Sequence, residues 1–336
     1  MAIARNGRGR PTRQSVYSAV DDEKSALDRI GGLPHPSVAG DIWDSIWFEE
    51  THHSTAIEGN TLILKEVRQL LEEGRAVGEK ELKEYLEVQG YAEAAKWVYS
   101  QATEDDLLRN DPYVNLTELR EIHRRVVSLA WEVAPPIDFL SGEGAGSFRL
   151  HDIKPFGNGM TPAPFTDIHP RITDWLRLAN SEPRPGVHLM EHLARVHAEF
   201  ERIHPFRDGN GRTGRLVLNL ILVRQGYAPL IVYKRDRPAY IRGLEHTDRG
   251  DYGTLGELVA RGVKNSIDRF VLPALAGPLQ LVPIAALART GVTALSLRRA
   301  AEKGRLRAQR QTRGWYSTGR WVDEYLASRR RGRHQE

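Results

Sequence analysis

The stretch HAEFERIHPFRDGNGRTGR, residues 197–215, decides the fold, because it holds a buried helix, a sharp turn and the start of a second helix. Apolar residues recur at helical spacing up to His204. Pro205 ends this helix, since the residue before a proline disfavours the α region. The Gly-Asn-Gly sequence at 209–211 predicts a turn. Apolar residues then return at helical spacing, so a second helix follows directly.

A glycine-rich turn that leads into a helix is an anion site, because free backbone N–H groups and the positive end of the helix dipole meet there. Arg212 and Arg215 lie on one face of the first turns and add guanidinium groups suited to phosphate oxygens. Asp208 is the one carboxylate of this cluster, and magnesium takes one or two carboxylates together with phosphate oxygens. His204 has a pKa suited to proton transfer near neutrality. The stretch therefore predicts a phosphate site with a metal and a base.

Residues 204–215 match the Fic-family signature H-x-F-x-[D/E]-G-N-G-R-x-x-R without a departure, and the chain resembles that family more loosely from about 40 to 265. The resemblance implies an all-α fold and transfer of AMP from ATP to a Ser, Thr or Tyr hydroxyl of a target protein. It implies His204 as general base and Asp208 as the ligand of Mg²⁺. Tyr240 stands where the family often has an aromatic near the nucleotide. The resemblance implies an ATP and phosphate cradle made of Gly209, Asn210, Gly211, Arg212, Thr213, Gly214 and Arg215.

A second element of the same family lies upstream. Residues 54–59, STAIEG, match its inhibitory pattern [S/T]-x-x-x-E-[G/N]. Ser54 and Glu58 are four residues apart on a helix predicted over about 41–58, hence on one face, and Gly59 is a suitable stop for that helix. The resemblance implies that the Glu58 carboxylate pairs with Arg215 and keeps the enzyme inactive.

Helical spacing of apolar residues predicts most of the remaining main body, and one segment interrupts it. Residues 141–165 are rich in Gly and Pro. An extended run at 147–153 and the turn-forming sequence Phe156-Gly157-Asn158-Gly159 predict a small β-hairpin. In the Fic family a flap at this place holds the target by strand pairing. The helices are predicted at 42–57, 62–71, 79–99, 116–130, 168–179, 189–203 and 212–225.

The C-terminal segment is strongly basic: residues 289–336 carry 13 Lys and Arg against 4 Asp and Glu. A short helix near 284–288, a turn at Gly291, a helix over 295–301 with Arg298 and Arg299, a β-wing over 304–316 and a closing helix are predicted. This order resembles the winged helix-turn-helix of excisionase-like DNA-binding domains, which implies DNA as a partner of 284–336. A basic appendage that packs on the main domain or binds a protein is the alternative.

The composition bounds the remaining possibilities. The chain of 336 residues has no cysteine, which excludes disulfides, Cys-ligated zinc and a thiol nucleophile. No apolar stretch suits a signal peptide or a membrane span, so we expect a cytoplasmic protein without a membrane partner. We expect a disordered basic arm at 1–14, a Fic-type domain at 15–276, a linker at 277–283 and the winged domain at 284–336.

Three alternatives to an autoinhibited adenylyltransferase remain. A DNA-binding regulator could sense a nucleotide through the same site without turnover, although it would not need His204. A Fic-like site could transfer or remove another phosphate-containing group. His188 and His192 also fit the H-x-x-E-H pattern of inverted zinc peptidases, a five-residue pattern that arises by chance. A homodimer is compatible with the sequence.

Overall fold

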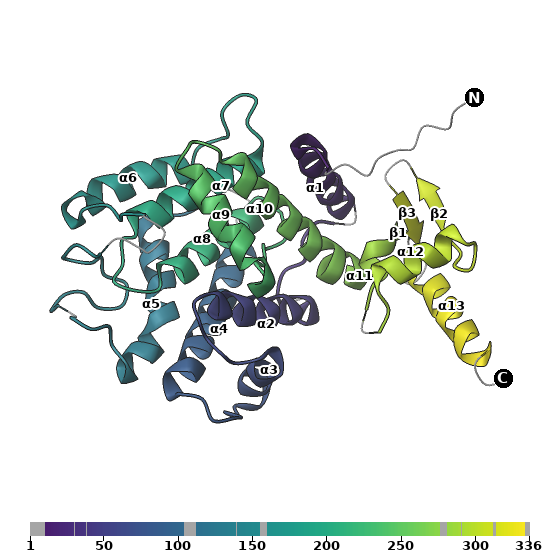
Figure 1. The fold of residues 1–336 in the computed structure, drawn as a ribbon, viewed down its shortest axis with the longest axis horizontal. Helices are drawn as coiled ribbons and strands as arrows, with labels where there is room; N and C mark the ends of the chain where they lie inside the picture. The colour runs from purple at the N-terminus through teal and green to yellow at the C-terminus, as the bar shows by residue number, and fades with distance from the viewer. Residues whose placement is uncertain are drawn as a thin grey trace.

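The computed structural model describes residues 11–332 apart from 30, 38, 104–111, 139, 155–159, 276–280, 290 and 312–313. Helices stack around the central helix α8, and a smaller group of short elements lies beyond α11 at the C-terminal side (Figure 1). Helix α8 packs against α4, α5 and α7, and α7 also packs against α6 and α10. Because α8 is apolar on nearly all sides after residue 215, it is buried along its length.

The predicted all-α main body is confirmed, and the seven helices predicted between 42 and 225 have ends within a few residues of those expected, whereas the helices after residue 225 had no predicted bounds. Its helices are α2 (Gly40–Ile57), α3 (Leu64–Glu73), α4 (Leu82–Thr103), α5 (Leu116–Val133), η1 (Phe165–Asp167), α6 (Ile168–Ala179), α7 (Leu189–Ile203), α8 (Asn210–Arg224), η2 (Lys234–Asp236), α9 (Arg237–Thr247), α10 (Gly253–Ser266), the π-helix η3 (Ile267–Val271) and α11 (Leu272–Leu275).

The predicted N-terminal arm overlaps a helix. Residues 1–10 lie outside the described part, but α1 begins at Arg13 and runs to Asp28. Thr12 caps it, its hydroxyl accepting a hydrogen bond from the Ser15 amide at 3.2 Å. Arg13 lies 3.0 Å from Asp251, and Tyr17 is buried against α10. The arm as predicted to residue 14 is therefore too long.

The predicted hairpin at 141–165 is wrong for the residues that the structure describes. They contain no strand; the predicted turn at 156–159 lies outside them. Two backbone amides of this segment bond to the residues at and just after the end of α7 instead of to a partner strand. The Arg149 amide donates to the Pro205 oxygen at 2.9 Å, and the Ala163 amide donates to the Arg202 oxygen at 3.1 Å. The flap is thus an irregular loop held against the predicted base.

The C-terminal elements form a small unit with an apolar cluster of its own, which includes Ile284, Leu297, Leu306 and Val322. Its elements are β1 (Val282–Pro283), η4 (Ile284–Leu287), α12 (Ala294–Glu302), β2 (Gln309–Gln311), β3 (Gly314–Ser317) and α13 (Gly319–Gly332). The strands form an antiparallel sheet in the order β1-β3-β2. The order of short helix, helix, strand pair and closing helix is as predicted, with the first helix as a single 3₁₀ turn, while the likeness to a winged helix-turn-helix stays a prediction. Most of the predicted linker, 277–283, lies outside the described residues.

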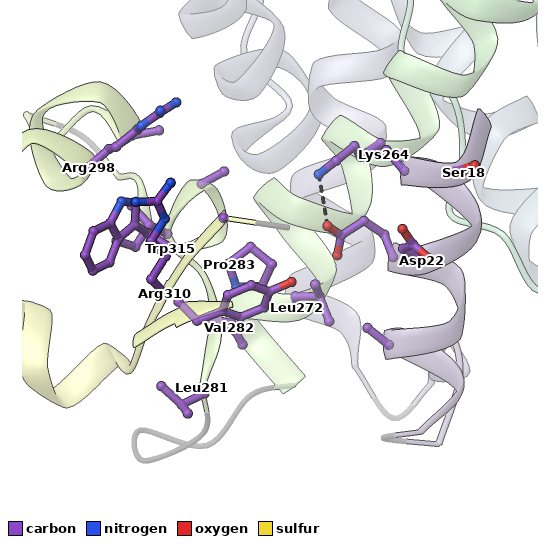
Figure 2. Close-up of a pocket in the computed structure, with 18 of the residues that line it drawn as sticks. Ser18, Asp22, Lys264, Leu272, Leu281, Val282, Pro283, Arg298, Arg310 and Trp315 are labelled. Carbon is purple, nitrogen blue, oxygen red and sulfur yellow. Dashed lines mark hydrogen bonds and ion pairs between the residues drawn. The ribbon is translucent and has the colours of Figure 1, made fainter. Parts of the chain in front are cut away.

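A cleft of about 1810 Å³ separates this unit from α1 and the end of α10. Figure 2 shows Asp22 and Lys264 on the main-body side, and Arg298 and Arg310 across from them. Lys264 also donates to Glu23 of α1 at 3.0 Å. Among the described helices, none has the length and apolar character needed to cross a membrane.

Candidate active site

Helix α7 ends at the residue predicted to be the base. His204 caps α7 with φ at 49°, in the left-handed region that few non-glycine residues adopt. Its Nδ1 lies 3.2 Å from the backbone oxygen of Glu201. Because a carbonyl oxygen can only accept, Nδ1 carries the proton and Nε2 is the basic nitrogen. Burial lowers the pKa of His204 to about 4, so its imidazole is neutral at pH 7.

The side chain of Asn210 closes the turn between α7 and α8. Its Oδ1 accepts from the Phe206 amide and its Nδ2 donates to the Phe206 oxygen, both at 2.9 Å. The side chain is buried, and both its oxygen and its nitrogen bond to Phe206. The backbone of Asn210 lies at the start of α8, where the first N–H groups have no carbonyl partner in their own helix.

Two glycines of the turn are required by their surroundings. Gly209 has φ at 79°, and a Cβ there would lie 2.6 Å from a methyl of Val127. At Gly211 a Cβ would lie 2.5 Å from Oε1 of Glu58. The first amides of α8 are thus open to an oxyanion, and a carboxylate already lies beside them.

His123 of α5 supports the turn, a role that the sequence did not reveal. Its Nδ1 accepts from the Gly146 amide at 2.9 Å, so Nε2 carries the proton and donates to the Asp208 oxygen at 2.9 Å. Its ring stacks on Phe206 with 3.7 Å between centroids. Burial lowers its pKa to about 3. A neutral imidazole therefore joins the flap to the turn.

Arg149 is a second residue that the sequence did not single out. It is 1% exposed. Its guanidinium donates to the backbone oxygens of His204 and His151 at 2.9 Å each and of Ala163, and lies 3.7 Å from the Asp152 carboxylate. It holds the flap against the carbonyl of the predicted base. Its only advance signal is an arginine inside a loop that is otherwise rich in Gly and Pro.

The predicted cationic cluster is present, with unequal partners. Arg212 is buried, and its guanidinium has only long contacts: 3.3 Å to Asp208 and 3.6 Å to Glu87. Its Nε has no hydrogen-bond partner. Arg215 is also buried and bonds to Ser54 of α2 and to Glu58 after it. Two buried guanidinium groups thus lie beside the N-terminus of α8, as predicted for an anion site.

The predicted inhibitory residues contact Arg215. Its Nη2 donates to Oε1 of Glu58 at 2.8 Å and to the Ser54 oxygen at 3.0 Å, and its Nε donates to the Ser54 hydroxyl at 2.8 Å. Glu58 is the cap residue after α2, and Gly59 follows with φ at 106°. Burial works to raise the pKa of Glu58, but Arg215 outweighs it and the pKa falls below its usual value. The carboxylate is ionised and joined to Arg215 by one hydrogen bond, since Ser54 takes the second edge of the fork.

Three other predicted cradle residues lie beneath the turn. Thr213 is fully buried, and its amide donates to the Gly209 oxygen at 2.9 Å. Gly214 lets α8 approach α7, since a Cβ there would lie 2.9 Å from Phe200. Tyr240 is 4% exposed. Its hydroxyl lies 2.6 Å from Nε2 of His197, and Arg215 lies over its ring. These three support the site from within.

The residues present fit a magnesium ion only in company with phosphate. Among the described residues, no three His, Asp or Glu side chains gather to hold a metal. Asp208 is 46% exposed, with Oδ1 accepting from the Gly209 amide at 2.6 Å and Oδ2 3.3 Å from Arg212. One ionised carboxylate beside an anion turn is the donor set that magnesium shares with a nucleotide. His188 and His192 do not form the pair of ligands that the alternative zinc pattern needs, because the His188 side chain caps α7 and its ring stacks on Tyr17.

Comparisons with known proteins agree with this geometry. Residues 113–222 match the model of the Fic/DOC family. The chain is 32% identical over 271 residues to a "Protein adenylyltransferase Fic" of Nematostella vectensis, a match that covers 79% of this chain and 58% of that protein. It is 30% identical to the protein of the same name in Drosophila mojavensis, over 77% of this chain and 46% of that one. The chain therefore spans about half the length of the curated relatives it matches.

Solved structures extend the likeness to the fold. Fic-1 from C. elegans superimposes with a TM-score of 0.63 at 28% identity, over 77% of this chain and 72% of that one. A Fic family protein from Desulfovibrio desulfuricans G20 superimposes with a TM-score of 0.58 at 20% identity, over 94% of this chain and 98% of that one. The second likeness concerns the fold alone and extends over most of both chains.

Proposed function

Because the chain contains a domain of the Fic/DOC family, we propose that it is an autoinhibited protein adenylyltransferase, which transfers AMP from ATP to a Ser, Thr or Tyr hydroxyl of a target protein. One observation carries the proposal. The neutral His204, with Nε2 as its basic nitrogen, lies just before the turn that leads into α8, and the first turns of α8 hold two buried arginines. A base beside a phosphate cradle is what transfer to a hydroxyl requires.

In the proposed reaction, the target hydroxyl oxygen attacks the α-phosphorus of ATP while Nε2 of His204 takes its proton. The bond from the α-phosphorus to the oxygen that bridges to the β-phosphorus breaks, and pyrophosphate leaves. The first amides of α8 and the guanidinium groups of Arg212 and Arg215 stabilise the phosphate charge. Asp208 would hold a magnesium ion, which supplies further neutralisation of that charge when bound.

Autoinhibition follows from the position of Glu58. Its carboxylate takes a hydrogen bond of Arg215 and lies against Gly211, where the outer phosphates of ATP would bind. A nucleotide that enters must displace it or bind in another pose. A displacement of the α-phosphate by about 1 Å can cost on the order of 10²-fold in rate. ATP can therefore bind the inhibited enzyme without reacting.

Labelled ATP, magnesium and a lysate test this function, with the wild type compared to Glu58→Gly. We expect AMP on protein only with the variant. Asp208→Ala in that background should raise the magnesium concentration needed for half-maximal rate. The same magnesium requirement in both would contradict the metal assignment. Release of AMP from modified protein, or transfer of another labelled phosphate group, would favour the alternative chemistries.

A second candidate function belongs to the C-terminal unit. The observation that favours it is the order η4, α12, β2 and β3, with Arg298 and Arg299 exposed on α12 while Leu297 and Ala300 pack inward. A helix presented in this way suits the major groove of DNA. The chain could then be a DNA-bound enzyme, or a nucleotide-sensing regulator if His204 proves idle. A homodimer and a cytoplasmic location stay predictions.

A further inference from the structure

Glu201 is a buried carboxyl to which the proposed mechanism gives no role. It lies on α7 one turn before His204, and its side chain is 13% exposed. Its Oε1 is buried without a hydrogen-bond partner. Buried carboxyls are almost always hydrogen-bonded or paired, because desolvation of an unpaired one is costly. The Oε1 atom of Glu201 is an exception to this rule, and it lies next to the proposed base.

The carboxyl faces two imidazoles of its own helix. Oε2 lies 3.9 Å from Nδ1 of His204, and Oε1 lies 3.7 Å from Nε2 of His197. On α8, a Cβ at Gly214 would lie 3.0 Å from Oε1, so no side chain at that position separates the carboxyl from the helix.

Three further titratable groups act on Glu201 from the neighbouring elements: Arg215 of α8, Glu58 after α2, and Tyr240 of α9. His197 stays neutral, since burial lowers its pKa to about 3. The Tyr240 hydroxyl also occupies its Nε2 at 2.6 Å. Of the groups around Glu201, only His204 gains a charge during the proposed reaction.

We propose that Glu201 is a positioning residue for the base: its backbone oxygen fixes the proton on Nδ1 of His204, and its carboxylate stabilises the imidazolium that forms when Nε2 takes the target's proton. This inference rests on the proposed adenylyl transfer. Glu201 would then both fix the tautomer of His204 and stabilise its positive charge. An acidic partner supplies these two functions to histidine in other enzymes.

The inhibitory contact acts on the same carboxyl. The pKa of Glu201 is raised to about 7, chiefly by burial; Arg215 lowers this pKa and Glu58 adds to the rise. When Glu58 leaves, that repulsion ends and the carboxylate form of Glu201 is favoured. Release of the inhibitory residue would then prepare the base as well as free Arg215 for phosphate.

The kinetic test uses the full chain carrying Glu58→Gly, with and without Glu201→Gln. The amide keeps the size of the side chain but cannot carry the charge. We expect kcat to fall by about tenfold, with the KM for ATP changed by less than about twofold. We also expect the rate of the Glu58→Gly chain to rise with pH through an inflection at or below about 7, absent when Glu201→Gln is added and retained with Glu201→Asp. Equal kcat and equal pH profiles would overturn the proposal.

Glu199→Gln is the matched control. Glu199 lies on the same helix and pairs with Arg202 at 2.8 Å and with Tyr252 at 3.0 Å. It should leave the inflection in place. A loss of rate in Glu201→Gln with an unchanged inflection would mean that the side chain only packs, and would also overturn the proposal.

A second measurement needs no activity, so it separates this inference from the proposed function. The imidazole of His204 is titrated by NMR in the full chain carrying Glu58→Gly, where the carboxylate form of Glu201 is favoured, with its resonance assigned from the spectrum of the Glu58→Gly/His204→Ala variant. Removal of the Glu201 charge should lower the pKa of His204 by about one unit, a tenfold change in its protonation. An unchanged pKa would refute the coupling even if AMP transfer is observed. A shifted pKa without any AMP transfer would keep the coupling and reject the enzyme.

Discussion

At the scale of single residues, His204 combines a strained backbone with a fixed tautomer. His204→Ala should lower AMP transfer by about 10²–10⁴-fold, the usual contribution of a general base. Nucleotide affinity should stay within a few-fold, because the cradle belongs to α8. The measurement is single-turnover transfer with saturating ATP in the Glu58→Gly background.

The left-handed φ of 49° at this position calls for a second variant. Asn tolerates this region better than Ala, so His204→Asn removes the base with less strain on the loop. Both variants should lose AMP transfer to the same extent. Rate loss below about tenfold in His204→Asn would place the base elsewhere.

Gly209 gives a prediction about stability. Its φ of 79° disfavours any side chain, and a Cβ would lie 2.6 Å from Val127. Gly209→Ala should lower the free energy of unfolding by roughly 2–4 kcal/mol, from backbone strain and overpacking together. Gly186→Ala is a suitable control, since its φ of 81° is similar and nothing lies within 4 Å. Urea unfolding of both variants measures the difference. Equal losses of unfolding free energy would contradict the contribution from overpacking against Val127.

The sequence predicted the residues whose chemistry is local and missed those that act through folding. Arg215, Glu58 and His204 stand in short motifs with fixed spacing. His123 and Arg149 became meaningful only because α5 and the flap meet the turn, a meeting that no spacing records. The bonds of the Asn210 side chain to the backbone of Phe206, four residues earlier, could not be predicted either.

At the scale of elements, buried hydrogen bonds hold the middle of α2 in place, while the residue after its end contacts Arg215. Glu50 is buried and accepts hydrogen bonds from Tyr91 at 2.9 Å, from Asn219 at 2.8 Å and from Tyr99. Glu58, two turns further on, is 40% exposed. The helix can therefore stay docked while its last residue moves away from the phosphate site.

Glu58→Gly should raise the rate of autoAMPylation strongly, by about 10²-fold or more, while the wild type is nearly silent. Ser54→Ala should derepress more weakly, because it removes one of the three hydrogen bonds to Arg215 and leaves the carboxylate. Arg215→Ala should not activate, since it removes the phosphate partner too. Asp41→Asn, in the first turn of α2, is the control. Equal rates in wild type and Glu58→Gly would exclude autoinhibition by this residue.

The helices of the main body were predictable because each buries one stripe of apolar residues at helical spacing. Helix α1 was not among the predicted helices, since its buried residues follow directly on the arginine-rich arm. The flap was misjudged because its alternating pattern is also satisfied by a loop whose amides bond to Pro205 and Arg202. The spacing of apolar residues indicates which side of an element is buried. It does not indicate a hydrogen-bond partner that is distant in the sequence.

At the scale of the whole molecule, the C-terminal unit is strongly basic, and we expect the full chain to bind duplex DNA through that unit. Each phosphate contact should contribute about −0.9 to the slope of log K against log salt. Arg298→Glu with Arg299→Glu should make that slope shallower by about two. Arg298 also lines the cleft that faces α1 (Figure 2), so DNA and the main body would compete for this side of α12.

The matched control reverses the same number of charges on the main body: Arg75→Glu with Arg177→Glu, whose side chains are 68% and 74% exposed. If net charge alone drives binding, both pairs of substitutions should weaken it alike. If α12 is the interface, only the first pair should change the slope, because counterion release counts the phosphates contacted and ignores distant charge. Fluorescence anisotropy of a labelled duplex between 50 and about 300 mM salt decides between the two. Equal slopes for the two variants, or no complex at the lowest salt with the full chain folded, would return the C-terminal unit to the role of a basic appendage.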